Sequence, residues 1–269
     1  MKITTEKEAW AAVKQDVNAL QYVPEELKTY ELCLEAVKEE GNPNSFAFKY
    51  VPEKFKTPEL CLEAVKAECI WDIFCFYALK YVPEALKTPE LCLEAVKRHG
   101  FALQYVPEAL KTPELCLAAV RNMGSALEYV PEALKTQELC IEAVKSATFI
   151  YEDFDYCDML ETLEAIPEEL KTPELYLAAV RERGWVIKYV PEELITPELC
   201  HEAVKSYGDE DSMINIPALE YVPEKFKTPE LCYEAVKIRG FALEYVPEEL
   251  KAQVKAAIDA EGKQEEKKG

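Results

Sequence analysis

Apolar residues recur along this chain in a short phrase that repeats nearly word for word. The copy that begins at Thr88 reads TPELCLEAVKRHGFALQYVPEALK, and its apolar positions fall at Leu91, Cys92, Ala95 and Val96. Residues at this spacing share one face of an α-helix, so the first part of the phrase predicts an amphipathic helix. One such helix cannot bury its apolar face alone, but a stack of copies can.

The two ends of this helix carry residues that prefer those positions. Thr88 is expected to be the N-cap, because its hydroxyl can accept a hydrogen bond from a free amide of the first turn. Pro89 suits the first helical position, where no N–H is needed, and Gly100 is expected to end the helix in a left-handed conformation. A second, shorter helix is predicted over residues 101–106, because the residue before Pro107 disfavours the α conformation.

The phrase occurs nine times with a base period of 24 residues. Its aligned threonines are Thr5, Thr29, Thr57, Thr88, Thr112, Thr136, Thr172, Thr196 and Thr228. A fixed period in this range indicates a solenoid. We therefore predict an all-α fold, an α-solenoid of about nine two-helix repeats that forms one domain over residues 1–258. Residues 259–269 are charged and lack a core-forming pattern, so they are predicted to be disordered.

Part of the phrase follows the pattern A-V-K-x-x-G-x-A-L-x-Y. It stands as AVKRHGFALQY at 95–105, AVRNMGSALEY at 119–129 and AVKIRGFALEY at 235–245. In this the chain resembles a bacterial family of short helical repeats classed as a domain of unknown function. The resemblance implies an α-solenoid, and it implies no activity.

The charge balance narrows the possible partners. The chain has 31 Lys and Arg against 51 Asp and Glu, a formal net charge of −20. This argues against direct binding to nucleic acid or to an anionic membrane and favours basic surfaces. The N-terminal MKITTEKEAW lacks the apolar core of a signal peptide, and the most apolar run, CIWDIFCFYAL, is too short to span a bilayer. A cytoplasmic location is therefore expected.

Most of the cysteines fall at one position of the phrase. These are Cys33, Cys61, Cys92, Cys116, Cys140, Cys200 and Cys232. One buried thiol per unit predicts neighbours about one repeat apart, which is beyond the roughly 7 Å between Cα atoms that a disulfide allows. Free buried thiols fit a reducing compartment. Cys69, Cys75 and Cys157 lie elsewhere and form no Cys-x-x-Cys pair, which disfavours a zinc site.

The sequence offers no familiar catalytic motif. Its two histidines, His99 and His201, belong to no Cys/His or Ser/His/Asp arrangement. There is no Walker A loop, no dinucleotide-binding glycine pattern and no His-Glu-x-x-His. We therefore expect that the chain is not an enzyme and needs no cofactor or metal.

Four units carry extra residues between their two predicted helices, at 39–46, 67–77, 146–161 and 206–217. All four enter at the same turn, so we predict that they emerge on one edge of the solenoid, which is commonly a binding face in repeat proteins. These 47 residues contain twelve Asp and Glu, ten aromatic residues and no Lys or Arg. Acids are tolerated in this density where a cationic partner supplies the opposite charge.

We predict that the partner-binding residues lie in the last three of these insertions. They are Trp71, Asp72, Phe74, Tyr77, Phe149, Tyr151, Glu152, Asp153, Phe154, Asp155, Tyr156, Asp158, Asp209, Glu210 and Asp211. Two other interpretations stay open. The aromatic residues could instead form small satellite cores. Alternatively, calcium could bind Asp153, Asp155 and Asp158 or the cluster of Asp209, Glu210 and Asp211, although the EF-hand spacing and its central glycine are absent.

The leading functional hypothesis is a non-enzymatic solenoid, monomeric outside its complex, that binds a basic protein surface through these acidic and aromatic insertions. A sharper form is an inhibitor that mimics nucleic acid and blocks the basic channel of a nucleic-acid-binding protein or nuclease. A rival of another class is a receptor for a small molecule or metal. No direct contact with nucleic acid or a membrane is expected.

Overall fold

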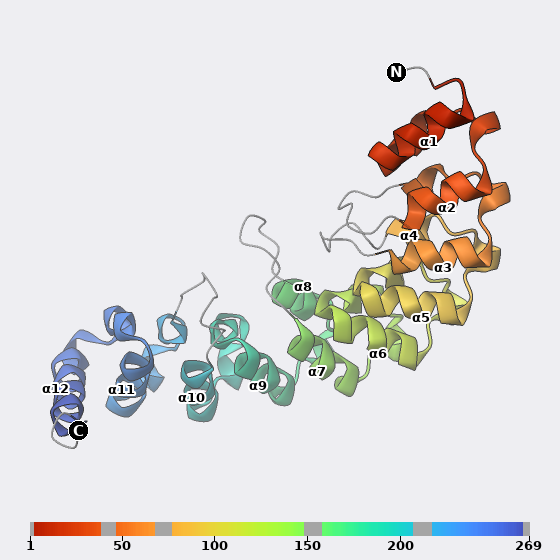
Figure 1. Cartoon of the computed structure of the whole chain (residues 1–269). Coiled ribbons are helices and arrows are strands. Elements are labelled where there is room, and N and C mark those ends of the chain that lie inside the picture. Colours follow the sequence, from red (N-terminus) through yellow and green to blue (C-terminus); the bar gives the residue numbers. More distant parts are fainter. Residues whose placement is uncertain (1–2, 39–46, 68–76, 148–157, 207–216, 266–269) are drawn as a thin grey trace. The chain divides into compact units, whose positions relative to one another are not determined.

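The computed structural model describes residues 3–38, 47–67, 77–147, 158–206 and 217–265, and no strand occurs within these ranges (Figure 1). The chain divides into two compact units. Unit 1 comprises Met1–Ile150 and Tyr156–Ile166, and unit 2 comprises Tyr151–Asp155 and Pro167–Gly269. Each unit is described by itself, and the single domain over residues 1–258 stays a prediction.

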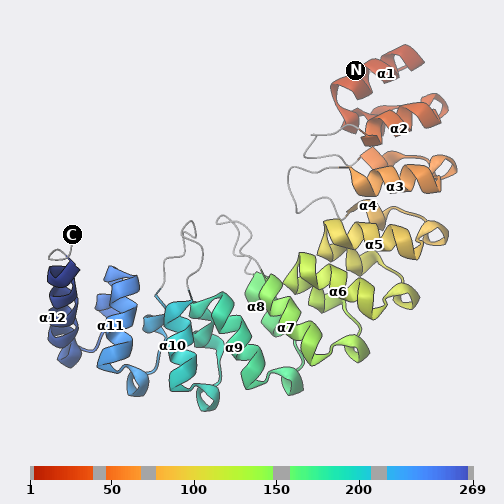
Figure 2. The ribbon, with the colours of Figure 1, turned by 60° about the horizontal axis from the view of Figure 1, so that its bottom comes forward.

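Unit 1 is built from two layers of helices (Figure 2). The first layer contains α1 (Glu6–Gln15), α2 (Tyr30–Lys38), α3 (Pro58–Lys66), α5 (Pro89–Arg98), α6 (Pro113–Asn122) and α7 (Gln137–Ser146), each packed on the next. The second layer contains η1 (Val17–Tyr22), η3 (Ala47–Tyr50), α4 (Tyr77–Lys80), η6 (Gly100–Tyr105), η8 (Gly124–Tyr129) and α8 (Asp158–Glu164). One-turn 3₁₀-helices close the repeats, at η2 (Glu25–Leu27), η4 (Glu53–Phe55), η5 (Glu84–Leu86), η7 (Glu108–Leu110) and η9 (Glu132–Leu134).

Unit 2 repeats this arrangement. Its first layer contains α9 (Pro173–Glu182), α10 (Pro197–Lys205), α11 (Pro229–Ile238) and α12 (Glu248–Glu265). Its second layer contains η11 (Gly184–Tyr189), η13 (Ala218–Glu220) and η15 (Gly240–Tyr245), and its closing turns are η10 (Glu168–Leu170), η12 (Glu192–Leu194) and η14 (Glu224–Phe226). The predicted fold class, an all-α solenoid of two-helix repeats, is confirmed.

The predicted helix starts and buried stripe are confirmed. In α5 the Thr88 hydroxyl accepts a hydrogen bond from the Leu91 amide at 3.3 Å, and Pro89 occupies the first helical position. The equivalent threonine makes the same bond in each of the other repeats, from Thr5 to Thr228. The stripe of Leu, Cys, Ala and Val in α5 is buried. Local cap chemistry and apolar spacing thus define the first layer.

The second helix of the repeat is mostly a 3₁₀-helix. In the Thr88 repeat, η6 ends with the Val106 amide donating to the Leu103 carbonyl at 3.2 Å. A 3₁₀-helix has three residues per turn, so residues three apart share one face. Gly100, Leu103 and Val106 follow that spacing, and all three are buried.

The prediction that Gly100 ends α5 in a left-handed conformation is wrong. The C-cap is His99, whose backbone is extended at φ −143° and ψ 112°, and Gly100 instead begins η6. A Cβ atom at Gly100 would lie 2.5 Å from the carbonyl oxygen of Ala119 on the neighbouring helix α6. The glycine is therefore required because two repeats approach each other closely, and its backbone freedom is not the reason.

The prediction of disorder over 259–269 is wrong as far as residue 265, because α12 continues through Glu265. The Glu261 carboxylate accepts hydrogen bonds from the Tyr233 hydroxyl and, at 2.6 Å, from the Lys237 ammonium, both on α11. These contacts hold the end of α12 against α11. Residues 266–269 lie outside the described residues.

We predict that Gly124→Ala will destabilise the protein and that Gly240→Ala will not. A Cβ atom at Gly124 would lie 2.3 Å from the Ala143 carbonyl oxygen, whereas nothing lies within 4 Å of one at Gly240. Overpacking at Gly124 should lower the free energy of unfolding by roughly 1–3 kcal/mol. The Gly240 variant should change it by less than about 1 kcal/mol. Urea unfolding followed by circular dichroism measures both, and equal effects would contradict the close-approach explanation.

Candidate interaction surfaces

A buried lysine links most of the repeats to the next one. The Lys87 ammonium lies 2.5 Å from Glu84 of its own closing turn and donates to the Tyr105 carbonyl oxygen of the following repeat at 2.9 Å. The Lys87 side chain is only 6% exposed. A buried ammonium is tolerated when its donors are satisfied and an opposite charge lies near it. Here both conditions are met by residues of two successive repeats.

The same contact recurs through both units. The donor and acceptor pairs are Lys28 and Tyr50, Lys56 and Tyr81, Lys87 and Tyr105, Lys111 and Tyr129, Lys135 and Ala165, and Lys227 and Tyr245. Each of these lysines also pairs with the glutamate three residues before it. The contact therefore fixes where each second-layer helix ends.

Two repeats of unit 2 depart from this pattern. The Lys171 ammonium pairs with Glu168 at 2.5 Å, and among the described residues it makes no hydrogen bond to the next repeat. Ile195 stands where the bridging lysine stands in the other repeats. At this junction the Lys225 ammonium lies 2.9 Å from a carboxylate oxygen of Glu192, and both side chains are exposed. The hydrogen bond and charge of Lys225 lower the pKa of Glu192. An exposed ion pair thus crosses the junction that lacks a buried ammonium.

Exposed glutamates line the edge where the first-layer helices begin. In unit 1 they comprise two sets. The second residues of α2, α3, α5, α6 and α7 are Glu31, Glu59, Glu90, Glu114 and Glu138, and the first residues of the closing turns are Glu25, Glu53, Glu84, Glu108 and Glu132. We call these ten residues the acidic edge. The turn glutamates pair with the bridging lysines. The helix glutamates form no ion pair with any residue that the structure describes. Glu174, Glu198 and Glu230 occupy the same exposed position in unit 2.

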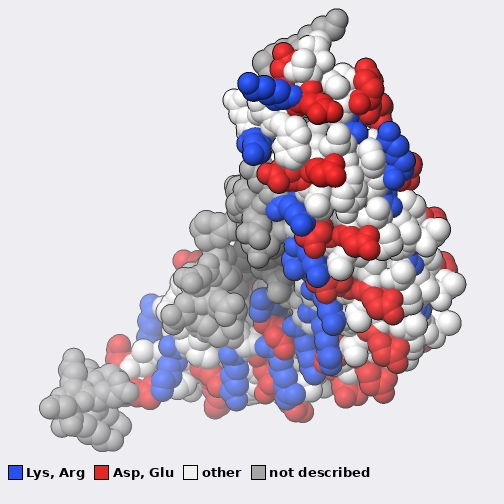
Figure 3. Space-filling view, turned by 45° about the vertical axis from the view of Figure 1, so that its right-hand side comes forward, with Lys and Arg blue, Asp and Glu red and all other residues white. Residues whose placement is uncertain are grey.

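Exposed cations gather at the opposite end of the same helices, where they complement the helix dipole. In unit 1 they are Lys38, Lys66, Lys97, Arg98, Arg121 and Lys145, which we call the basic band. Figure 3 shows Lys and Arg side chains in a band beside Asp and Glu side chains. Several of these cations are neutralised locally, as where Arg121 lies 2.9 Å from Glu142. The three insertions of unit 1 each begin within one residue of the end of a first-layer helix that carries a cation of this band.

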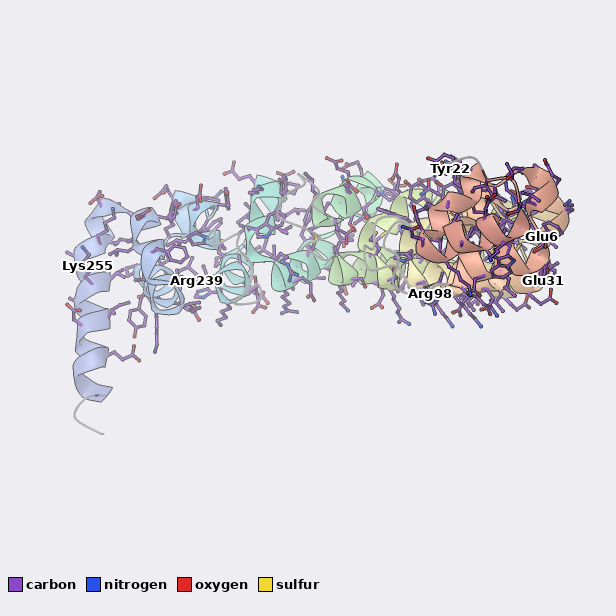
Figure 4. The ribbon with its side chains drawn as sticks, turned by 45° about the horizontal axis from the view of Figure 1, so that its top comes forward. Glu6, Tyr22, Glu31, Arg98, Arg239 and Lys255 are labelled. Atoms are coloured by element: carbon purple, nitrogen blue, oxygen red, sulfur yellow. The ribbon has the colours of Figure 1, made fainter. Side chains whose placement is uncertain are left out.

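A row of tyrosines follows the second layer of unit 1. We call Tyr22, Tyr50, Tyr81, Tyr105 and Tyr129 the tyrosine ladder, since each occupies the same position before Val-Pro. Figure 4 shows Tyr22 at one edge of unit 1 and Arg98 at the opposite edge. Sequence analysis did not predict this row, although a tyrosine stands at this position in every repeat except the one with Ala165.

The structure describes few of the predicted partner-binding residues. Outside the described residues lie Trp71, Asp72, Phe74, Phe149, Tyr151, Glu152, Asp153, Phe154, Asp155, Tyr156, Asp209, Glu210 and Asp211. Tyr77 begins α4, and its side chain also lies outside the description. The insertion surface therefore stays a prediction from sequence.

The predicted role of Asp158 in an exposed binding surface is wrong. Its side chain is fully buried, and its Oδ1 atom accepts a hydrogen bond from the Ser125 amide at 2.8 Å. The Thr162 hydroxyl donates to the Asp158 carbonyl oxygen at 2.6 Å. Asp158 thus fastens α8 to the start of η8. It is structural, and the hypothetical calcium site loses one of its three carboxylates.

The seven repeat cysteines are buried and free, as predicted. Burial raises the pKa of the Cys92 thiol from 9.0 to about 11, although the nearby Lys87 charge opposes the shift. Burial also raises the pKa of Cys33, Cys61, Cys116, Cys140 and Cys200 to about 11. The reactive species is the thiolate, so these thiols should be inert in the folded protein.

We predict that Lys87→Met will lower the free energy of unfolding by roughly 1–3 kcal/mol. The substitution keeps an apolar stem but removes the donor that satisfies the Tyr105 carbonyl. Lys97→Met is the control, because Lys97 is exposed at the end of the adjoining α5. That change should cost less than about 0.5 kcal/mol. Chemical unfolding compares the two, and an undiminished stability of the Lys87 variant would show that the bridge is dispensable.

We predict that folding stability will decline as the pH rises from about 9 toward 11. The folded thiols hold their protons through this range, whereas unfolded thiols release theirs near their ordinary pKa. The unfolded state is therefore favoured as the pH increases. Iodoacetamide labelling at pH 8, mapped by mass spectrometry, should leave the seven repeat cysteines unmodified until urea is added. Labelling of Cys92 or Cys116 without urea would contradict their burial.

Among the described residues, no group of three His, Cys, Asp or Glu side chains is placed to hold a metal ion. Within the same ranges, every helix is too short or too polar to cross a membrane. These findings describe only the part of the chain outside the insertions and the extreme termini.

Comparison with protein families gives a repeated match along the chain. The family described as Domain of unknown function (DUF4116) matches residues 9–56, 29–87, 57–111 and 196–251, which together cover more than half of the chain. This confirms a repeat family of unknown function, while the A-V-K-x-x-G-x-A-L-x-Y motif and the bacterial assignment stay predictions. No curated protein and no solved structure matches the chain.

Proposed function

We propose that this chain, which belongs to the DUF4116 family, is a non-enzymatic protein-interaction solenoid whose partner presents a basic surface. The family description carries no activity, so the proposal rests on the surface of the protein. The observation that carries it is the row of helix glutamates in the acidic edge. Each is exposed, and none is neutralised by a described cation.

The spacing of these carboxylates supports a repeated contact. Packed helices lie about 8–10 Å apart, so glutamates at one helical position recur at a similar interval. Carboxylates in such a row repel one another, and a partner with cations along the same line would relieve that repulsion. The net charge of −20 would also accelerate the encounter with a basic protein.

The insertions remain part of the proposal on sequence grounds. We propose that Glu152, Asp153 and Asp155 add to the acidic contact and that neighbouring aromatic residues supply apolar anchors. Asp158 is left out because it is buried. We further propose a reducing, cytoplasmic setting, which fits the free buried thiols.

We predict that a basic protein will be retained from native lysate by the immobilised full chain at low salt and less well at moderate salt. The triple variant Glu90→Gln, Glu114→Gln and Glu138→Gln should weaken that complex by roughly ten-fold, because it removes unpaired carboxylates from the acidic edge. A second triple variant, Glu152→Gln, Asp153→Asn and Asp155→Asn, tests the insertion. Mass spectrometry identifies the partner, and titration calorimetry with the purified partner measures the affinities.

The matched control is Glu35→Gln, Glu128→Gln and Glu164→Gln, which changes the charge equally at exposed positions away from the helix starts. This control should retain most of the affinity. Equal loss in all three variants would reduce the proposal to non-specific charge attraction, and unchanged binding in the first two would refute it. Competition by DNA or RNA for the partner would identify the nucleic-acid mimic.

A further inference from the structure

The second layer exposes the most prominent aromatic surface of the described residues. In unit 1 the side chain of Tyr22, at the end of η1, is 69% exposed. In unit 2, Tyr189 on η11 and Phe241 on η15 are each 38% exposed. In unit 1, Tyr50, Tyr81 and Tyr105 continue the ladder from Tyr22 and are half-buried. Aromatic residues that gather along one layer, as these tyrosines of unit 1 do, are typical of binding sites.

The backbone of the ladder is held in place by the bridging lysines. The carbonyl oxygens of Tyr50, Tyr81 and Tyr105 accept hydrogen bonds from Lys28, Lys56 and Lys87 at 2.9–3.0 Å. A ligand would therefore meet tyrosines whose main-chain positions are already fixed, which reduces the entropy lost on binding.

Two exposed lysines lie between successive rungs of the ladder. The Lys49 ammonium lies 5.6 Å from the Tyr50 ring centroid and 5.9 Å from that of Tyr81. The Lys80 ammonium lies 5.9 Å from the ring centroids of both Tyr81 and Tyr105. These contacts bring neighbouring rings to within about 12 Å of each other, since a cation–π contact reaches about 6 Å on each side.

We propose that the tyrosine ladder from Tyr22 to Tyr105 binds a segment of another protein in the polyproline II conformation, with acidic side chains opposite Lys49 and Lys80. This inference is independent of the proposed acidic-edge function, because it concerns the other layer and a ligand of the opposite charge.

The spacing of the ladder matches that conformation. A polyproline II helix has three residues per turn and rises about 3.1 Å per residue, so every third side chain returns to the same face after about 9 Å. Packed helices of the solenoid recur at about 8–10 Å. Successive tyrosines can therefore contact residues i, i+3 and i+6 of one ligand. A β-strand does not fit, because its side chains return to one face every two residues, after about 7 Å.

The hydrogen-bonding capacity of the ladder also favours this ligand. The backbone carbonyls of a polyproline II segment have no internal partners, and tyrosine hydroxyls and lysine ammonium groups are donors. An α-helical ligand could match the spacing over two turns, but its carbonyls are already bonded internally. Aromatic-lined surfaces recognise proline-rich segments in this way.

The charge along the ladder limits the site to its first four rungs. In the first four rungs the tyrosine is preceded by a neutral or cationic residue: Gln21, Lys49, Lys80 or Gln104. In the fifth rung Glu128 precedes Tyr129. Burial and the Glu128 charge raise the pKa of Tyr129 to about 12. The ladder is therefore neutral or cationic up to Tyr105 and becomes anionic beyond it, which sets where an acidic ligand would end.

The test is fluorescence anisotropy of the full chain with labelled synthetic peptides at moderate salt. The probe is Glu-Pro-Pro repeated five times, and Glu-Gly-Gly repeated five times has the same charge without the conformational preference. We expect the proline peptide to bind, and the glycine peptide to bind about ten-fold more weakly because it must first be ordered. The double variant Lys49→Glu and Lys80→Glu should weaken the proline peptide by at least about ten-fold.

Control variants separate the ladder from general charge and from misfolding. Lys66→Glu with Lys97→Glu makes the same charge change in the basic band and should leave peptide affinity within about two-fold. Tyr50→Phe with Tyr81→Phe keeps the rings and removes two hydroxyl donors, so it should weaken binding about three- to ten-fold if those donors contact the ligand. Circular dichroism and thermal unfolding confirm that each variant is folded.

Several outcomes would overturn the proposal. Equal binding of the proline and glycine peptides would show that conformation is not recognised, and equal loss in the ladder and band variants would show that only total charge matters. Binding of a labelled oligothymidylate in place of the peptide would identify single-stranded nucleic acid as the ligand. A peptide of repeated Lys-Pro-Pro tests the acidic edge. If this peptide binds and Glu-Pro-Pro does not, the ladder proposal is refuted and the acidic-edge proposal stands.

Discussion

The buried ammonium of the bridging lysine is the interaction on which the rest of the structure depends. A charge in this position is stable only when two repeats meet correctly, because one supplies the carboxylate and the next supplies the carbonyl. Apolar packing supplies cohesion between helices, but it tolerates small slips. The lysine adds a directional contact, so wherever it bridges, the next repeat is held at a defined position. The regular stacking of repeats thus depends on a contact between an ammonium, a carboxylate and a carbonyl group.

Regular spacing turns single residues into extended surfaces. Glu90 complements the dipole of its own helix, and because the repeats are evenly stacked it also becomes one member of the acidic edge. A tyrosine whose carbonyl receives the bridging lysine, such as Tyr105, becomes one rung of the ladder. The two surfaces differ in chemistry and lie on different layers of the same repeats. The fold can therefore offer different partners different lines of contact.

Sequence patterns predicted the parts of this structure that depend on neighbours along the chain. The cap at Thr88, the proline after it and the buried stripe around Cys92 all follow from local rules. The roles of Lys87, Gly100 and Asp158 did not, because each depends on an atom in another repeat. A lysine or an aspartate in an acidic sequence is normally solvated, and only the packed structure shows that these two are buried. The insertion residues predicted to bind a partner mostly lie outside the described chain.

The bridging contact also explains how the solenoid accommodates loops of very different length. Lysine and carbonyl are 18 residues apart in a plain repeat, and 22, 25 and 30 residues apart across three of the four insertions. The bond length is 2.9–3.2 Å in all of them. Loop closure becomes only slowly more costly with length. Evolution can therefore lengthen or exchange a loop in one repeat without disturbing the register of the next. The stacked repeats and the insertions between their helices can therefore vary independently.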